Sequence, residues 1–440
     1  MIDSLEKRFS LLESGVKGTR TYDKIGTILN VTGLILESEG PEVTIGQVCT
    51  IISERHNLEM EAEVVGFKGN SVLLMALDSV HSIHPGCKVI SRKNSNSVPA
   101  GNALLGRVID GMGRPIDGKG PLVSETREGF HCEPPNPLNR KLIKDSFSTG
   151  IKSIDTCIPL GIGQRVGIFA GSGVGKSILL GMIARGSSAD VNVISLVGER
   201  GRELREFIEN DLGPEGLAKS VIVVSTSDQT APMRIRASNL ATAISEGFRD
   251  EGRNVLLLMD SLTRFAMAQR EIGLAAGEPP ASRGYVPSVF SVLPKLLERT
   301  GTNDVGAITA IYTVLVEGDD MNEPVADAVR GFLDGHIVLS RKLANANHFP
   351  AIDILRSVSR LDRAVCSDDE ISLISNVRDL LSLYKQNEDL INVGAYIKGS
   401  NPKIDLAIDK FPLIESFLRQ KYDETSTREQ ALTQLFALFS

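Results

Sequence analysis

Residues 165–177 have the sequence RVGIFAGSGVGKS, which is the strongest structural signal in the chain. The first six residues form an apolar run typical of a buried strand, and ILLGMIAR at 178–185 is compatible with a helix. Small residues between a strand and a helix let successive backbone N–H groups face a polyphosphate, and the helix N-terminus adds favourable partial charge. Although Ala170 stands where the strict motif has glycine, the segment predicts a phosphate-binding loop.

The loop also predicts which residues meet a nucleotide. The Lys176 side chain is placed to reach the β- and γ-phosphates, and the Ser177 hydroxyl is placed to bind Mg²⁺. The predicted nucleotide-binding residues are Gly171, Ser172, Gly173, Val174, Gly175, Lys176 and Ser177. ATP and Mg²⁺ are therefore the expected ligands.

On both sides of the loop, residues 150–345 alternate apolar runs with helical patterns. Such runs, separated by helices, are typical of a parallel sheet covered on both faces, so an α/β nucleotide domain is expected. Besides 165–170, the predicted strands are 191–198, 220–226, 254–260, 305–316 and 336–340.

Two carboxylates follow predicted strands and should emerge at the same edge of the sheet as the loop. Asp260 ends the run NVLLLMD and is expected to hold Mg²⁺ through water, the alternative being a residue that caps the next helix. Glu199, in VGERGRE, is the candidate for polarising the attacking water. Arg200 is expected to shape the site, although its surroundings also fit an ordinary charged helix face.

The flanking segments differ in character. Residues 19–95 carry short apolar runs separated by turns, which predicts a small β-barrel or sandwich, and 96–365 form the nucleotide domain. Residues 366–440 show helical periodicity and are expected to form a C-terminal helical domain. In residues 1–18, an apolar stripe predicts a helix that either packs on its own domain or contacts a partner or a neighbouring subunit.

Composition excludes some classes of protein. The 440 residues carry 48 Lys+Arg against 55 Asp+Glu, a net charge of −7, so nucleic acid is not an expected partner. No run is apolar and long enough to span a membrane, and the N-terminus lacks a signal peptide pattern, so a cytoplasmic protein is expected.

At this point the sequence resembles the catalytic subunits of rotary-type ATPases, over essentially residues 20–440. Within that superfamily it most resembles the flagellar protein-export ATPases, with the injectisome secretion ATPases a near second and ATP synthase catalytic subunits third. The motifs that carry the resemblance are the phosphate loop, VGERGRE (197–203), LLLMDSLTRFAMAQREIGLAAGEPP (256–280), RGYVPSVFSVLPKLLER (283–299), VEGDDMNEP (316–324) and AIDILRSVSR (351–360).

The resemblance implies a fold, an activity and an assembly. The fold would be an N-terminal β-barrel, a RecA-like nucleotide domain and a C-terminal helical domain, and the activity would be Mg-dependent ATP hydrolysis that energises type III export. Lys176, Glu199 and Arg360 would be catalytic. Arg360 matches the arginine that reaches a neighbouring subunit's site, so a homo-hexamer is expected.

Further partners follow only from the resemblance. They are a peripheral stator-like regulator on the N-terminal helix, a central stalk protein, the membrane proteins of the export gate, and chaperone–substrate complexes on the C-terminal domain. Through them the chain would associate peripherally with the cytoplasmic membrane. Asp319, Asp320 and Glu323, in the acidic loop 317–324, would face the stalk in the centre of the ring, the alternative being a solvated turn.

Two other hypotheses compete with an export ATPase. A RecA-like nucleic-acid translocase is disfavoured by the acidic charge and by the few aromatic residues of the predicted barrel. A non-catalytic ring subunit is disfavoured by Glu199, because such a subunit needs no acid that polarises water.

Overall fold

The computed structural model describes residues 25–78, 83–92, 97–316, 318 and 320–439, without the side chains of 126–128. The predicted helix in residues 1–18 lies outside the described residues, as does Asp319. The chain divides between residues 95 and 96 into two compact units, with residues 275–277 grouped with the first.

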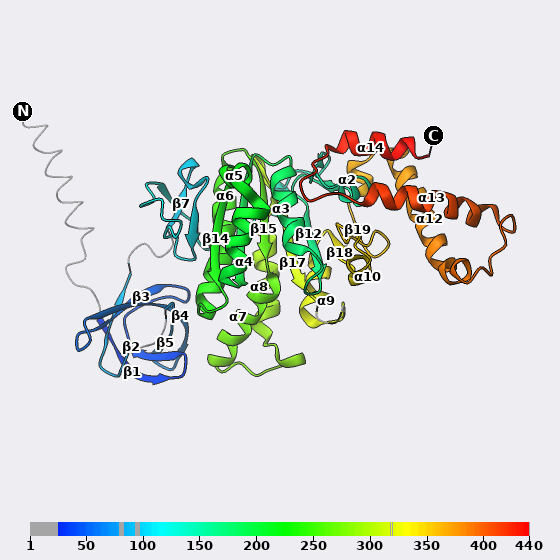
Figure 1. Cartoon of the computed structure of the whole chain (residues 1–440). Coiled ribbons are helices and arrows are strands. Elements are labelled where there is room, and N and C mark those ends of the chain that lie inside the picture. Colours follow the sequence, from blue (N-terminus) through cyan, green and yellow to red (C-terminus); the bar gives the residue numbers. More distant parts are fainter. Residues whose placement is uncertain (1–24, 79–82, 93–96, 317, 319, 440) are drawn as a thin grey trace, which may run out of the picture. The chain divides into compact units, whose positions relative to one another are not determined.

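The first unit contains a closed β-barrel, drawn in blue in Figure 1, with strand order β1-β2-β5-β4-β3-β6. Alternate side chains of its strands point inward, as in IGTILNVT of β1, where Ile28 is buried. Ile28, Leu36, Ile51 and Leu74 belong to its core, and the predicted small barrel is confirmed. The strands are β1 (Ile25–Thr32), β2 (Ile35–Glu39), β3 (Val48–Ser53), β4 (Leu58–Lys68), β5 (Ser71–Ala76) and β6 (Lys88–Ser91).

The second unit is built on a nine-stranded sheet with the order β19-β18-β12-β17-β15-β13-β14-β8, in which β16 pairs with β17. From β18 to β8 neighbouring strands run parallel, whereas β16 and β19 are antiparallel to their neighbours. The strands are β8 (Val108–Asp110), β12 (Arg165–Ala170), β13 (Val191–Glu199), β14 (Ser220–Thr226), β15 (Asn254–Asp260), β16 (Gly301–Thr302), β17 (Ala307–Leu315), β18 (Gly335–Val338) and β19 (Val358–Ser359).

Strand β8 is a short extended piece of the glycine-rich segment after residue 96, and its pairing with β14 was not predicted. Two small antiparallel pairs also belong to this unit. They are β7 (Ser97–Ala100) with β9 (Glu125–Glu128), and β10 (Ser146–Phe147) with β11 (Leu160–Gly161).

The sheet separates two hydrophobic cores, which explains why its strands are apolar along their whole length. On β13, Ile194 and Leu196 belong to one core, while Val193 and Val197 belong to the other. The first core contains residues of α2 (Lys152–Cys157) and α3 (Lys176–Gly186), and the second those of α6 (Ala231–Asp250), α7 (Leu262–Ala275), α8 (Pro287–Glu298) and α9 (Pro324–Phe332).

The remaining helical segments of the nucleotide domain are short. They are η1 (Asn102–Leu104), η2 (Pro137–Asn139), α4 (Gly201–Glu206), the π-helical turn η3 (Phe207–Leu212), α5 (Gly213–Ala218), η4 (Ser282–Gly284), α10 (Arg341–Asn345) and α11 (Asp362–Val365).

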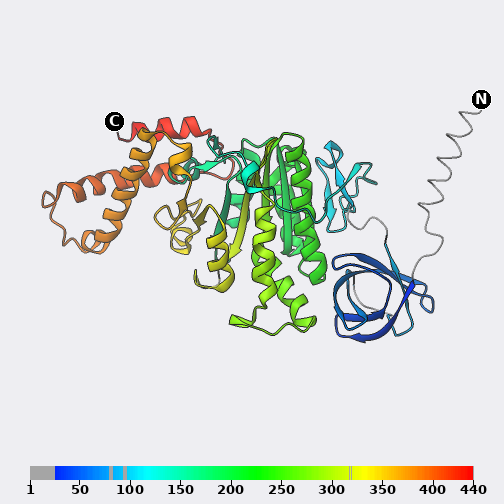
Figure 2. The ribbon, with the colours of Figure 1, turned by 180° about the vertical axis from the view of Figure 1, so that it is seen from behind.

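The C-terminal region is helical, as predicted, and consists of α12 (Asp368–Asn392), α13 (Pro402–Leu418) and α14 (Arg428–Ala437). A capping box of Ser367 and Glu370 starts α12, and the buried Val377 and Leu381 join the first core of the sheet. In Figures 1 and 2 these orange and red helices lie beyond the β18–β19 side of the sheet. Among the described residues, none of the helices is both long and apolar enough to cross a membrane.

Candidate nucleotide-binding site

The phosphate loop joins β12 to α3 at the carboxyl edge of the parallel strands. Gly173 has φ 77° and Gly175 has φ 87°, a backbone region that favours glycine, and Gly175 is the N-cap of α3. Val174 buries its side chain in the first core and so anchors the loop. The other predicted loop residues line a cavity of about 830 Å³. They are Gly171, Ser172, Gly173, Gly175, Lys176 and Ser177.

Two carboxylates from neighbouring strands converge on the loop lysine. Lys176 Nζ lies 2.5 Å from Asp260 Oδ1 and 3.5 Å from Glu199 Oε1. Asp260 ends β15 and Glu199 ends β13, and these adjacent parallel strands place both ends at one edge. Asp260 Oδ1 also accepts a hydrogen bond of 2.7 Å from Thr313 Oγ1 on β17.

The charges of this group perturb each other. Burial alone would lower the pKa of Lys176, but the charges of Asp260 and Glu199 raise it above the usual value. Burial raises the pKa of Glu199, and the charge of Asp260 raises it further, against the opposing effect of Lys176. A partly buried glutamate with a raised pKa beside a phosphate loop is suited to proton transfer or to orienting water.

Glu199 lines the same cavity, together with Arg200, Arg264 and Phe349. Arg200 is exposed, and its Nη1 donates to Glu203 Oε1 at 3.4 Å, so the structure places it at the cavity but pairs it along its own helix. Arg264 approaches because Gly198 lacks a side chain: a Cβ there would lie 2.9 Å from the Arg264 Cβ.

A second cavity, of about 630 Å³, shares Gly175, Ile178 and Phe349 with the first. Its remaining lining comes from α3, from residues 347–350 and from residues 419–424. Because it continues from the phosphate loop and is lined partly by apolar side chains, it has the character of a site for the nucleotide base.

The chemistry of the donor set fits Mg²⁺ that is shared with a nucleotide. Ser177 lines the cavity and the Asp260 carboxylate contacts Lys176, and oxygen ligands of these kinds suit this ion. Within the described residues there is no cluster of three or more His, Cys, Asp or Glu side chains that would hold a metal alone. Mg²⁺ usually takes one or two protein ligands and completes its shell with phosphates and water.

Arg360 lies at the amino-terminal ends of the parallel strands, whereas the phosphate loop of its own chain lies at their carboxyl ends. It directly follows β19, in which Ser359 pairs with Gly335, the first residue of β18. Since β18 runs parallel to β12, Arg360 lies where β12 begins, and a strand of six residues spans about 20 Å. The exposed Arg360 donates from Nη2 to the Arg330 carbonyl at 3.4 Å.

The acidic loop residues have local partners. Asp320 Oδ2 lies 3.1 Å from Arg283 Nη2, and its Oδ1 accepts from the Asn322 N–H. Glu323 is the N-cap of α9, where its Oε2 accepts from the N–H groups of Val325 and Ala326, both at 3.0 Å.

Three residues of the site were not predicted. Thr313, Arg264 and Phe349 meet the phosphate loop or its carboxylates from a strand, a helix and a loop, and although Arg264 belongs to the motif at 256–280, no role was predicted for it. For Arg264, the close approach to Gly198 is visible only in three dimensions.

Family models match the sequence along most of its length. Residues 150–359 match the nucleotide-binding domain and 28–93 the β-barrel domain of the ATP synthase alpha/beta family. Residues 366–437 match the C-terminal domain of the type III secretion ATPase EscN.

Whole-chain comparisons agree with these matches. The chain is 52% identical over 426 residues to the flagellum-specific ATP synthase of Bacillus subtilis, covering 96% of this chain and 97% of that protein. It is similar in structure to the assembled ATPase EscN of the enteropathogenic E. coli type III secretion system, with TM-score 0.89 and 45% identity over 94% of this chain and 100% of that one. EscN in complex with its central stalk EscO gives TM-score 0.87 and 44% identity, with the same coverage of both chains.

Proposed function

Because the chain belongs to the family of flagellum-specific ATP synthases and type III secretion ATPases, we infer that it hydrolyses ATP to energise type III export of flagellar proteins across the cytoplasmic membrane. The observation that carries this function is the convergence of Lys176, Glu199 and Asp260 at the phosphate loop. A chain that only bound nucleotide would need the loop but not Glu199.

The residues divide the work of phosphoryl transfer. The Lys176 ammonium, which contacts Asp260, is the group that would meet the β- and γ-phosphates. Glu199 orients and polarises the attacking water, and its raised pKa suits it to accept a proton. Ser177 and Asp260 would hold Mg²⁺, which when bound neutralises charge that develops on the phosphate oxygens.

The working assembly is a ring of identical subunits, a homo-hexamer by family. Arg360 lies far from its own phosphate loop, so in this proposal it serves the site of the adjacent subunit in a head-to-tail interface. Arginine fingers of this kind contribute about 10³–10⁵ in turnover.

The proposed partners also follow from membership of this family. EscN forms a complex with its central stalk EscO, and we propose that the loop with Asp319, Asp320 and Glu323 faces a stalk here. A stator-like regulator, the export gate and chaperone–substrate complexes complete the set, and through them the chain would associate with the cytoplasmic membrane. Export by an injectisome is the second candidate, supported by the 45% identity with EscN, against 52% for the flagellum-specific relative.

ATP hydrolysis by the assembled chain tests the enzymatic part of the proposal. Glu199→Gln should retain ATP binding and lose about 10²–10⁴ in kcat. Equal turnover in wild type and Glu199→Gln would contradict it. Deleting the gene in its own organism then decides the pathway: loss of motility supports the flagellar assignment, and loss of virulence-type secretion with intact motility contradicts it.

A further inference from the structure

Strand β12 has a functional element at each end. Its carboxyl end leads into the phosphate loop, and its amino end follows Gln164, a residue with 0% exposure. Gln164 lies beside Ser359, the residue directly before Arg360. Within one subunit, Gln164 and strand β12 therefore connect the segment before Arg360 with the phosphate loop.

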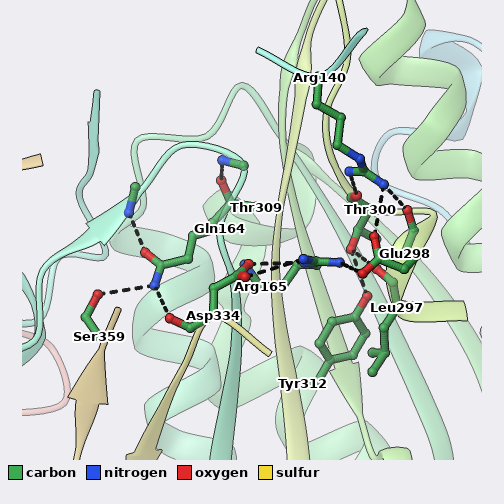
Figure 3. Close-up of polar contacts among 12 residues, drawn as sticks. Arg140, Gln164, Arg165, Leu297, Glu298, Thr300, Thr309, Tyr312, Asp334 and Ser359 are labelled. Carbon is green, nitrogen blue, oxygen red and sulfur yellow. Dashed lines mark hydrogen bonds and ion pairs between the residues drawn. The ribbon is translucent and has the colours of Figure 1, made fainter. Parts of the chain in front are cut away.

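The Gln164 side chain makes three hydrogen bonds in this place (Figure 3). Its Oε1 accepts from the Gly161 N–H at 2.8 Å, and its Nε2 donates to the Asp334 carbonyl at 3.0 Å and to Ser359 Oγ at 3.2 Å. The Asp334 carbonyl also accepts from the Arg360 N–H at 3.0 Å. Gln164 and the finger's backbone thus share one acceptor.

Asp334 is itself fixed to β12 through its carboxylate. The Arg165 N–H and Nε each lie 3.1 Å from Asp334 Oδ2, and Arg165 Nη2 lies 3.3 Å from Oδ1. Arg165 Nη1 forms a further ion pair of 2.6 Å with Glu298, which Arg140 also contacts (Figure 3). A carboxylate held by a forked guanidinium has little freedom, so the shared carbonyl is a rigid reference point.

The strands beside this point also pack closely. A Cβ on Gly335 would lie 2.6 Å from the Val358 carbonyl oxygen, so β18 and β19 approach as only glycine allows. Ser359, directly before Arg360, therefore pairs with Gly335 of β18 through its backbone and with Gln164 through its hydroxyl.

We propose that Gln164 is a positioning residue for Arg360, which it holds in register with the strand that ends in the same chain's phosphate loop. The inference rests on the proposed function, in which Arg360 serves the neighbouring site. It adds to that function a link within one subunit: Arg360, which would serve the neighbour, is connected through Gln164 to strand β12, which leads into the subunit's own phosphate loop. A misplacement on the order of 1 Å at a reacting centre costs about 10²-fold in rate.

Two variants test whether the hydrogen bonds of Gln164 matter for turnover. Gln164→Met keeps the length of the side chain and removes all three hydrogen bonds, so the kcat of the assembled ring should fall about 10²-fold with KM for ATP little changed. Ser359→Ala removes the bond from Gln164 Nε2 and the bond that the Leu361 N–H donates to Ser359 Oγ at 3.4 Å, and it should lower kcat about 2- to 10-fold. Ser195→Ala is the matched control and should keep wild-type kcat. Within the described part of the chain its buried hydroxyl has no hydrogen-bond partner.

Mixed rings provide the decisive readout. In an equal mixture of Gln164→Met and Glu199→Gln chains, about a quarter of head-to-tail interfaces join an intact site to a well-held finger. Hydrolysis should rise above that of either variant alone, towards about a quarter of the wild-type rate. Without such a rise Gln164 acts on its own site, and the proposal is wrong.

The pair Arg360→Ala with Glu199→Gln makes the two possible failures distinguishable. If that mixture does not recover activity, both the trans role of Arg360 and this proposal fail. If it recovers while the Gln164→Met mixture does not, the proposal alone fails. Melting temperatures are measured for every variant. If Gln164→Met does not fold, the equal mixture of Ser359→Ala and Glu199→Gln decides: a rate above half that of Ser359→Ala alone supports the proposal, and a rate of half contradicts it.

Discussion

Lys176 and Asp260 form a direct ion pair with an Nζ–Oδ1 distance of 2.5 Å, although 84 residues separate them in sequence. The pair is largely buried, with 12% and 5% of the two side chains exposed. The pair therefore places the predicted phosphate-binding cation in direct contact with the predicted metal-binding carboxylate.

This pairing predicts non-additive effects on stability. Lys176→Met leaves the buried Asp260 carboxylate without its cation and should lower the free energy of unfolding by about 3–5 kcal/mol. Adding Asp260→Asn should recover most of that loss, because the remaining pair is neutral, while hydrolysis stays absent. Urea denaturation of nucleotide-free protein measures both effects, and strictly additive losses would show that the pair is not coupled.

The pH dependence of turnover should report on Glu199. Only the ionised carboxylate orients water, so kcat falls as the pH drops through the pKa of Glu199. Because burial and Asp260 raise that pKa, the acid limb should lie above the pH of an ordinary glutamate.

Two neighbouring charges make this test specific. Glu203 raises the pKa of Glu199 and Arg264 lowers it. Glu203→Gln should therefore move the acid midpoint of kcat to lower pH, and Arg264→Met should move it to higher pH. If both variants leave the midpoint in place, another group controls the acid limb.

A buried ion pair away from the site provides a prediction about folding. Arg299 and Glu246 are 5% and 1% exposed, and the guanidinium donates from Nε and Nη2 to the two carboxylate oxygens. Glu246→Gln should lower the free energy of unfolding by about 3–5 kcal/mol, because it leaves a buried charge uncompensated. Arg202→Ala, which removes an exposed i,i+4 pair with Glu206, should cost at most about 0.5 kcal/mol.

The acidic loop predicts an effect on partner binding. Changing both Asp319 and Asp320 to Asn should weaken association with a basic stalk protein and leave nucleotide affinity unchanged, since Asp320 is not among the residues that line the phosphate cavity. Asp304→Asn is the control, because this exposed residue precedes the opposite end of β17. Stalk affinity measured by titration that is equal in all three proteins would remove the assignment.

Glu323 should behave differently from these aspartates. Because its carboxylate caps α9, Glu323→Ala should cost about 1 kcal/mol of stability. Thermal unfolding measures this loss, and an unchanged melting temperature would contradict the capping role.

The sequence predicted those features that depend on neighbouring residues. The six long apolar runs became β12, β13, β14, β15, β17 and β18, because strands buried on both faces are apolar throughout. The glycine-rich loop and the carboxylates that end β13 and β15 were also predicted, because each lies directly after a recognisable apolar strand. Strand β8 was missed because its three residues are fixed by pairing with β14 and not by their own pattern.

Contacts between distant residues were not visible in the sequence. Thr313 was not expected beside Asp260, nor was Asp260 expected to pair with Lys176, since strand order brings these residues together. Gln164 carries no motif at all, and its partners Asp334 and Ser359 lie 170 and 195 residues further along the chain.

The placement of Arg360 and the phosphate loop at opposite edges of one sheet has a genetic consequence. If Arg360 completes the neighbouring site as proposed, a copy that lacks it keeps its own phosphate loop and inactivates the site of an unaltered neighbour. In cells that make both forms, the altered gene should therefore be dominant, and the loss of swimming should exceed the fraction of altered copies.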